Sequence, residues 1–94
     1  MTRVDFEYKY DTDISFKNRI DAKYGTTLSN IILDLVDKRH EQKMTTQTLA
    51  YLSDISISTL VKIENFNQIP TLHTLQKLAN SLGVDIEFNL KAIE

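Results

Sequence analysis

The chain has 94 residues and a formal net charge of −2, with two glycines, one proline and no cysteine. This length allows one small hydrophobic core, and the lack of cysteine excludes disulfides, cysteine-based zinc sites and thiol nucleophiles. No apolar run is long enough to cross a membrane, and the N-terminus lacks the apolar segment of a signal peptide. We therefore expect a cytoplasmic globular protein with no membrane partner.

Residues 1–27 predict an N-terminal arm made of a strand and a short helix. Apolar and charged side chains alternate over residues 4–10, with the period of two that is typical of a half-buried strand. Asp13 is placed to cap a helix over residues 14–24, which Gly25 would end. Aromatic residues are enriched at protein interfaces, so those of the arm are candidates for partner binding, with packing on the chain's own domain as the alternative. These candidates are Phe6, Tyr8, Tyr10 and Phe16.

Four further helices are predicted between residues 28 and 83. The first, over residues 28–41, carries a core-facing apolar stripe and basic residues in its last turn, and Thr26 or Thr27 is placed to cap it. Each of the others follows a hydroxyl residue that is a good N-cap. They are expected at Thr46–Ser53 after Thr45, at Ile57–Asn65 after Ser56, and from Leu72 to Gly83 after Thr71.

Residues 45–83 contain the most informative pattern, a short helix, a tight turn at residues 54–56 and a second short helix. This is the arrangement of a helix-turn-helix unit, which presents a thin helix at the angle that fits the major groove of B-DNA. The side chains expected to face inward in this unit are Leu49, Ala50, Ile55, Leu60, Val61 and Ile63.

The C-terminal residues 84–90 alternate between apolar and polar and predict a second strand. A lone strand needs a partner for its backbone groups. Three partners are open: the N-terminal strand, the same strand of a second copy, or another protein. We expect a homodimer through the C-terminal helix and this strand, with contacts from Ile86, Phe88 and Leu90.

A family resemblance is carried by residues that match in register across three helices. They are Thr45, Leu49-Ala50, Ile55-Ser56, Ser58-Thr59-Leu60, Lys62-Ile63-Glu64-Asn65, Pro70-Thr71, Leu75, Leu78-Ala79 and Leu82-Gly83-Val84. In these positions the chain resembles the Xre-type, lambda-repressor-like helix-turn-helix family. The fold expected is mainly α, a bundle of four to five helices with short flanking β-strands, in which residues 28–94 form the DNA-binding domain.

Four positions depart from the family pattern. Asp54 and Phe66 stand where the family usually has glycine; aspartate tolerates left-handed backbone better than most residues, so the turn at Asp54 is expected to survive. Thr46 stands where glutamine is frequent, with Gln47 one place later, and Ile57 stands where a polar residue is frequent. These last two departures bear on base recognition rather than on the fold.

On the family model, the helix over residues 57–65 enters the DNA groove. Ser58 and Thr59 are then expected to contact base edges and Ile57 a thymine methyl group, while Glu64 resembles the family's structural glutamate. The full set of expected DNA-contacting residues is Thr46, Gln47, Ser56, Ile57, Ser58, Thr59, Lys62, Asn65, Lys43 and Arg39. For the basic members, a solvated face without phosphate contacts is the alternative.

The resemblance implies a transcriptional repressor that binds double-stranded operator DNA as a homodimer, with recognition helices about 34 Å apart. A helix-turn-helix core followed by a strand is similar to antitoxins of the HigA type in type II toxin–antitoxin modules. Such antitoxins also mask a cognate toxin, commonly a RelE/HigB-like mRNA endonuclease. The alternatives are a stand-alone Xre-type regulator without a toxin, and a protein-interaction module whose DNA binding is degenerate.

The sequence contains no constellation that is typical of an active site. His40 and His73 are far apart, and no third ligand is placed near either. We therefore expect no enzymatic activity, no metal, no cofactor and no small-molecule substrate.

Overall fold

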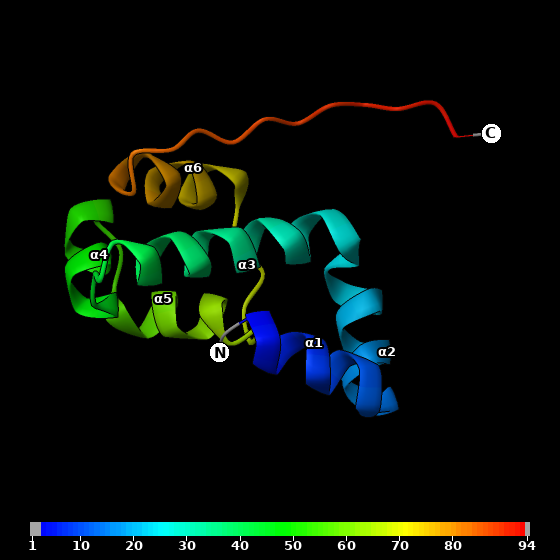
Figure 1. The fold of residues 1–94 in the computed structure, drawn as a ribbon. Coiled ribbons are helices and arrows are strands. Elements are labelled where there is room, and N and C mark those ends of the chain that lie inside the picture. The colour runs from blue at the N-terminus through cyan, green and yellow to red at the C-terminus, as the bar shows by residue number, and fades with distance from the viewer. Residues whose placement is uncertain (1–2, 94) are drawn as a thin grey trace.

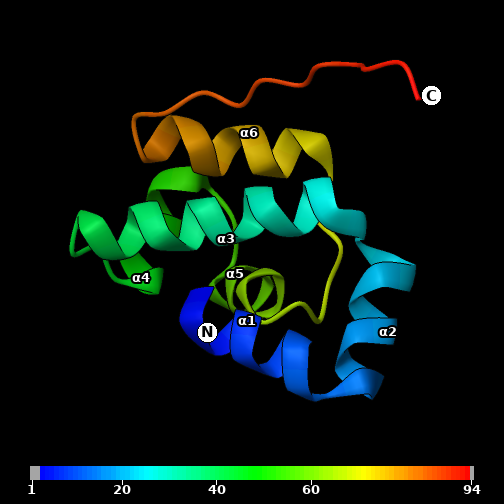
Figure 2. The ribbon, with the colours of Figure 1, turned by 45° about the vertical axis from the view of Figure 1, so that its right-hand side comes forward.

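The computed structural model describes residues 3–93, without the side chains of residues 22 and 23. Over these residues the chain forms six α-helices. They are α1 (Arg3–Thr12), α2 (Ile14–Lys23), α3 (Gly25–Glu41), α4 (Thr46–Ser53), α5 (Ile57–Glu64) and α6 (Leu72–Ser81). The long helix α3 crosses the middle of the molecule, with α6 on one side and α5 on the other (Figures 1 and 2). None of the described helices is both long and apolar enough to span a membrane.

The strand predicted over residues 4–10 is wrong, because these residues lie in α1. Phe6 and Tyr10 are one helical turn apart, both pack against the core, and their rings stack with centroids 5.7 Å apart. Val4 and Tyr8 are exposed on the helix. The alternating pattern therefore also contains an i, i+4 apolar pair, and tertiary packing selects the helix.

Charges at the ends of α1 also favour the helix. Asp5 lies in its first turn and Lys9 in its last, as suits the helix dipole. Arg3 forms ion pairs with both Asp34 and Asp37 of α3. These contacts fix the N-terminal end of α1 against the middle of α3.

The helix predicted over residues 14–24 is confirmed as α2, with Asp13 as its N-cap. The Asp13 carboxylate accepts hydrogen bonds from the backbone N–H groups of Ser15 and Phe16, at 3.0 and 3.1 Å. Phe16, Ile20 and Tyr24 lie on the inward side of α2 and are all buried.

Helix α3 begins three residues earlier than the sequence predicted, at Gly25. Gly25 has a φ of +64°, a left-handed conformation that glycine adopts without strain and that turns the chain from α2 into α3. Tyr24 takes the N-cap position without a side-chain hydrogen bond, so the predicted cap by Thr26 or Thr27 is wrong.

The three predicted caps of the helix-turn-helix region are confirmed. The hydroxyls of Thr45, Ser56 and Thr71 each accept a hydrogen bond from the backbone N–H three residues later, at 3.1, 3.0 and 3.1 Å. The inward side chains of this region are buried as predicted for Leu49, Ala50, Leu60 and Ile63, and Ile55 is half-buried. Val61 is instead exposed on α5.

Two non-glycine residues stand in left-handed backbone where glycine was expected from the resemblance. Asp54 has a φ of 56° in the turn between α4 and α5, so this turn survives as predicted. Phe66 has a φ of 59° directly after α5 and its side chain is fully buried. Its ring lies 4.8 Å from that of Phe6 and 5.2 Å from that of Tyr24, between centroids. Phe66 therefore joins the α1–α2 pair to the helix-turn-helix core.

The C-terminal strand predicted over residues 84–90 is not formed within the described chain, and its pairing with a second copy or with another protein stays a prediction. Residues 84–93 are extended and form no β-bridge with any other described part of the chain. Val84 and Ile86 pack on the core, whereas Phe88 and Leu90 are exposed. Since the N-terminal partner is a helix, pairing between the two predicted strands is excluded.

Candidate nucleic-acid interface

The helix-turn-helix unit is held together through its turn. The backbone N–H of Ile55 donates to the carbonyl of Ala50 at 3.1 Å, which closes the end of α4 around Asp54. Lys77 of α6 reaches the carbonyl of Asp54 at 3.4 Å. Because α5 packs against both α4 and α3, the orientation of α5 is set by two neighbours and by a short turn.

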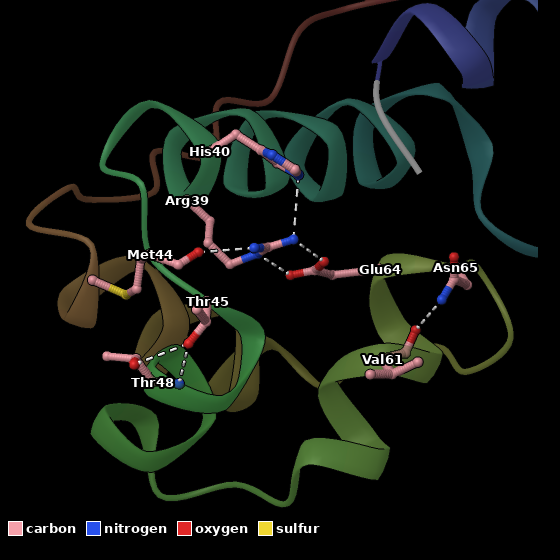
Figure 3. Close-up of polar contacts among 8 residues, drawn as sticks. All are labelled: Arg39, His40, Met44, Thr45, Thr48, Val61, Glu64 and Asn65. Atoms are coloured by element: carbon pink, nitrogen blue, oxygen red, sulfur yellow. Dashed lines mark hydrogen bonds and ion pairs between the residues drawn. The ribbon is translucent and has the colours of Figure 1, made fainter.

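A buried ion pair fixes the inner side of α5 (Figure 3). Arg39 of α3 forms two parallel hydrogen bonds to the carboxylate of Glu64, each 2.9 Å long. Its remaining terminal nitrogen donates to the carbonyl of Met44 at 2.9 Å. The Arg39 and Glu64 side chains are 12% and 8% exposed. Glu64 therefore has the structural role that the resemblance implied.

The placement of Arg39 differs from the prediction. It was expected to contact DNA, but its guanidinium is directed into the protein and bonded to Glu64 and Met44. The structural glutamate was predicted from the sequence, but its pairing with Arg39 was not. A basic residue in the last turn of the preceding helix is the signal that was available for it.

The outer face of α5 combines apolar and small polar side chains. Ile57 and Val61 are 44% and 40% exposed, and Ser58 and Lys62 are exposed beside them. Ile57 and Val61 are four residues apart, and therefore share one side of the helix. Val61 was predicted to face inward, and its exposure on this face corrects that prediction; its i+4 spacing from Ile57 is the signal that was available.

Other predicted α5 residues are engaged in local hydrogen bonds. The Ser56 hydroxyl donates to that of Thr59 at 2.8 Å, and Thr59 is half-buried. The Asn65 amide donates back to the carbonyl of Val61 at 2.9 Å (Figure 3). Ser56, Thr59 and Asn65 are thus engaged at the ends of α5, whereas the Ser58 side chain is exposed.

Fewer basic side chains are free to contact DNA than the sequence predicted, because Arg39 is engaged with Glu64. Lys43 and Lys62 are exposed. In the first turn of α4, Gln47 is exposed and Thr46 is half-buried. Within the described residues, no group of three or more His, Asp or Glu side chains is placed to hold a metal ion.

The aromatic residues of the N-terminal arm do not form one exposed surface. Phe6 and Phe16 are buried, with 6% and 4% exposure, in the same core as Phe66. Tyr8 is exposed. Tyr10 is half-buried and donates to Asp21 at 2.5 Å; this hydrogen bond, with one from Lys17, lowers the pKa of that carboxyl. For Phe6 and Phe16, packing on the chain's own domain is what the structure shows.

Comparison with known proteins places this geometry in a family. The helix-turn-helix family model HTH_3 matches residues 36–89, which span the end of α3, all of α4, α5 and α6, and the start of the tail. No match was found among the curated proteins or among the solved structures. The chain belongs to the Xre-like HTH_3 family of helix-turn-helix proteins, whose domains are sequence-specific DNA-binding regulators.

Proposed function

We propose that the chain is a transcriptional repressor that binds operator DNA as a homodimer, with α5 in the major groove. The observation that carries this proposal is the division of α5 into two sides. Leu60 and Ile63 are buried on the inner side, and Glu64 is bonded to Arg39. Ser58 and its neighbours remain exposed on the outer side. A rigidly held helix with one uncovered face is what insertion into a groove requires.

The composition of this face supports a specific mode of recognition. Ile57 and Val61 would pack on thymine methyl groups, and the Ser58 hydroxyl would bond a base edge. Lys62 and Lys43 would contact phosphates, together with Gln47 at the start of α4. The apolar pair suits operators that place thymines at adjacent positions of each half-site.

A dimer follows from the charge balance. The chain carries a formal net charge of −2, and two of its central basic residues are already paired within the fold. Attraction of one protomer to phosphates is therefore modest, since the electrostatic term scales with the number of neutralised phosphates. Two protomers that read half-sites about 34 Å apart double those contacts.

We expect Lys62→Ala to weaken binding to all DNA sequences and Ser58→Ala to change which sequences are preferred. Each phosphate contact that is removed lowers the steepness of the slope of log K against log salt concentration by about 0.9, so a homodimer that loses Lys62 from both protomers should lose about 1.8. Gel shifts on the chain's own promoter at several salt concentrations measure both effects. Lys9→Ala, which removes the same charge from α1, is the matched control. Equal salt slopes for Lys62→Ala, Lys9→Ala and the unaltered chain would contradict the placement of α5 in the groove.

We further propose that the repressor is the antitoxin of a type II pair and neutralises a RelE/HigB-like mRNA endonuclease. Supporting it are the apolar side chains that the fold leaves exposed on α1 and α2, Val4, Tyr8 and Ile14. Co-expression with the adjacent reading frame, followed by size exclusion, tests the proposal. We expect growth rescue and a stable complex, and we expect Tyr8→Ala to weaken the complex more than it weakens operator binding.

A stand-alone regulator is the second candidate. The burial of Phe6 and Phe16 favours it, because these aromatic rings stabilise the chain's own core and do not offer a surface to a toxin. An adjacent frame that is not toxic on its own, together with intact operator binding, would select this candidate.

A further inference from the structure

The extended tail has a self-complementary sequence. Residues at equal distances before and after Phe88 are chemically complementary, being either both apolar, both polar or of opposite charge. The successive pairs are Glu87 with Asn89, Ile86 with Leu90, Asp85 with Lys91, and Val84 with Ala92. An antiparallel pair of identical strands brings together the residues of each such pair when Phe88 lies on the two-fold axis.

We propose that the tails of two copies pair as an antiparallel β-ribbon centred on Phe88, and this proposal rests on the homodimer proposed above. In this register the apolar residues fall on one face of the ribbon, with Phe88 opposite Phe88 and Ile86 opposite Leu90. On the other face, Asp85 of each copy lies opposite Lys91 of the other. The dimer therefore contains two cross-strand pairs of opposite charge.

Contacts with the core hold the first part of the tail in place for pairing with a second copy. The backbone N–H of Val84 donates to the carbonyl of Ala79 at 3.0 Å, and Val84 and Ile86 pack on the core. The first part of the tail is thus fixed in an extended direction, while Phe88 and Leu90 continue the same apolar line into solvent. Unpaired extended backbone with an apolar edge is a template for strand pairing.

The position of the tail leaves the DNA-binding helix uncovered. Both ribbon views place the tail and α5 on opposite sides of α3 (Figures 1 and 2). Pairing of two tails therefore does not occupy the outer face of α5. Pairing in cis is excluded because residues 3–12 form α1, and pairing with a different protein is decided by the experiment below.

The chain has no cysteine, so single cysteines can report the register by disulfide formation under mild oxidation. We expect Asp85→Cys and Lys91→Cys each to remain unlinked alone, because equivalent residues lie about 20 Å apart along the ribbon. A mixture of the two variants should give the cross-linked dimer, and Phe88→Cys should link to itself, since directly opposed residues are within disulfide range.

Charge reversal gives a second measurement on the unoxidised dimer. Asp85→Lys and Lys91→Asp should each raise the dimer Kd about ten-fold, because each creates two like-charge pairs, and the double variant should restore it. Analytical ultracentrifugation, at the protein concentration that saturates operator DNA, measures the dimer Kd. A dimer in which Asp85→Cys links to itself as readily as to Lys91→Cys would overturn the register while leaving the homodimer standing. A monomeric unaltered chain would overturn both.

Discussion

Replacing Phe66 by alanine is expected to lower the free energy of unfolding by about 3–5 kcal/mol. The side chain is fully buried and contacts the rings of Phe6 and Tyr24, so truncation leaves a cavity between α1, α2 and the end of α5. A chain of this size has a total stability of about 5–15 kcal/mol. The loss is therefore a large fraction of the whole, and urea unfolding followed by circular dichroism measures it.

The backbone conformation of Phe66 gives this prediction an internal control. Its φ of 59° is strained for any residue with a Cβ, so Phe66→Gly should be about 1 kcal/mol more stable than Phe66→Ala. Ile69→Ala, at an exposed position of the same loop, should change stability by less than about 0.5 kcal/mol. An alanine variant as stable as the unaltered chain would show that the α1–α2 pair does not depend on Phe66.

Removal of one partner of the Arg39–Glu64 pair is expected to be similarly damaging. Arg39→Ala leaves the Glu64 carboxylate and the Met44 carbonyl without their donors in a poorly solvated site. Breaking a buried ion pair in this way costs about 3–5 kcal/mol. The thermal midpoint should fall strongly, and operator affinity should fall with it because α5 loses its attachment to α3.

A double-mutant cycle measures the interaction free energy between Arg39 and Glu64 apart from the separate contribution of each residue. Arg39→Met combined with Glu64→Leu removes both charges together, and it should cost less than the sum of the two single changes. Lys38→Ala, which breaks the exposed Lys38–Glu41 pair, is the matched control and should lie within about 0.5 kcal/mol of the unaltered chain. Additive single and double effects would mean that Arg39 and Glu64 act independently.

The helix-turn-helix unit could be predicted from the sequence because its signals are local. Thr45, Ser56 and Thr71 cap helices by bonding to backbone N–H groups three residues away, which requires no distant contact. The outward position of Ser58 and the inward position of Leu60 follow from helical periodicity in the same way. The same local rules gave the cap of α2 and the left-handed turn at Asp54.

The errors arose where tertiary contacts outweigh a local pattern. Residues 4–10 alternate like a strand, yet they form a helix that packs Phe6 and Tyr10 on the core and leaves Val4 and Tyr8 exposed, and Phe66 supplies the surface on which Phe6 packs. Arg39 likewise carries the positive charge that is typical of a DNA-contacting residue. Its hydrogen bond to Glu64, 25 positions further along the chain, gives it a structural role instead.

The sequence by itself therefore determined the family, the helix-turn-helix unit and the caps that begin four of the helices, because each depends on residues within one or two turns of each other. Only the tertiary structure decided that the N-terminal arm is helical, that Arg39 is directed inward and that the predicted C-terminal strand is unpaired in the monomer. The physical reason is that burial and ion pairing act between residues far apart in sequence, and their free energy exceeds the small local preferences of short segments.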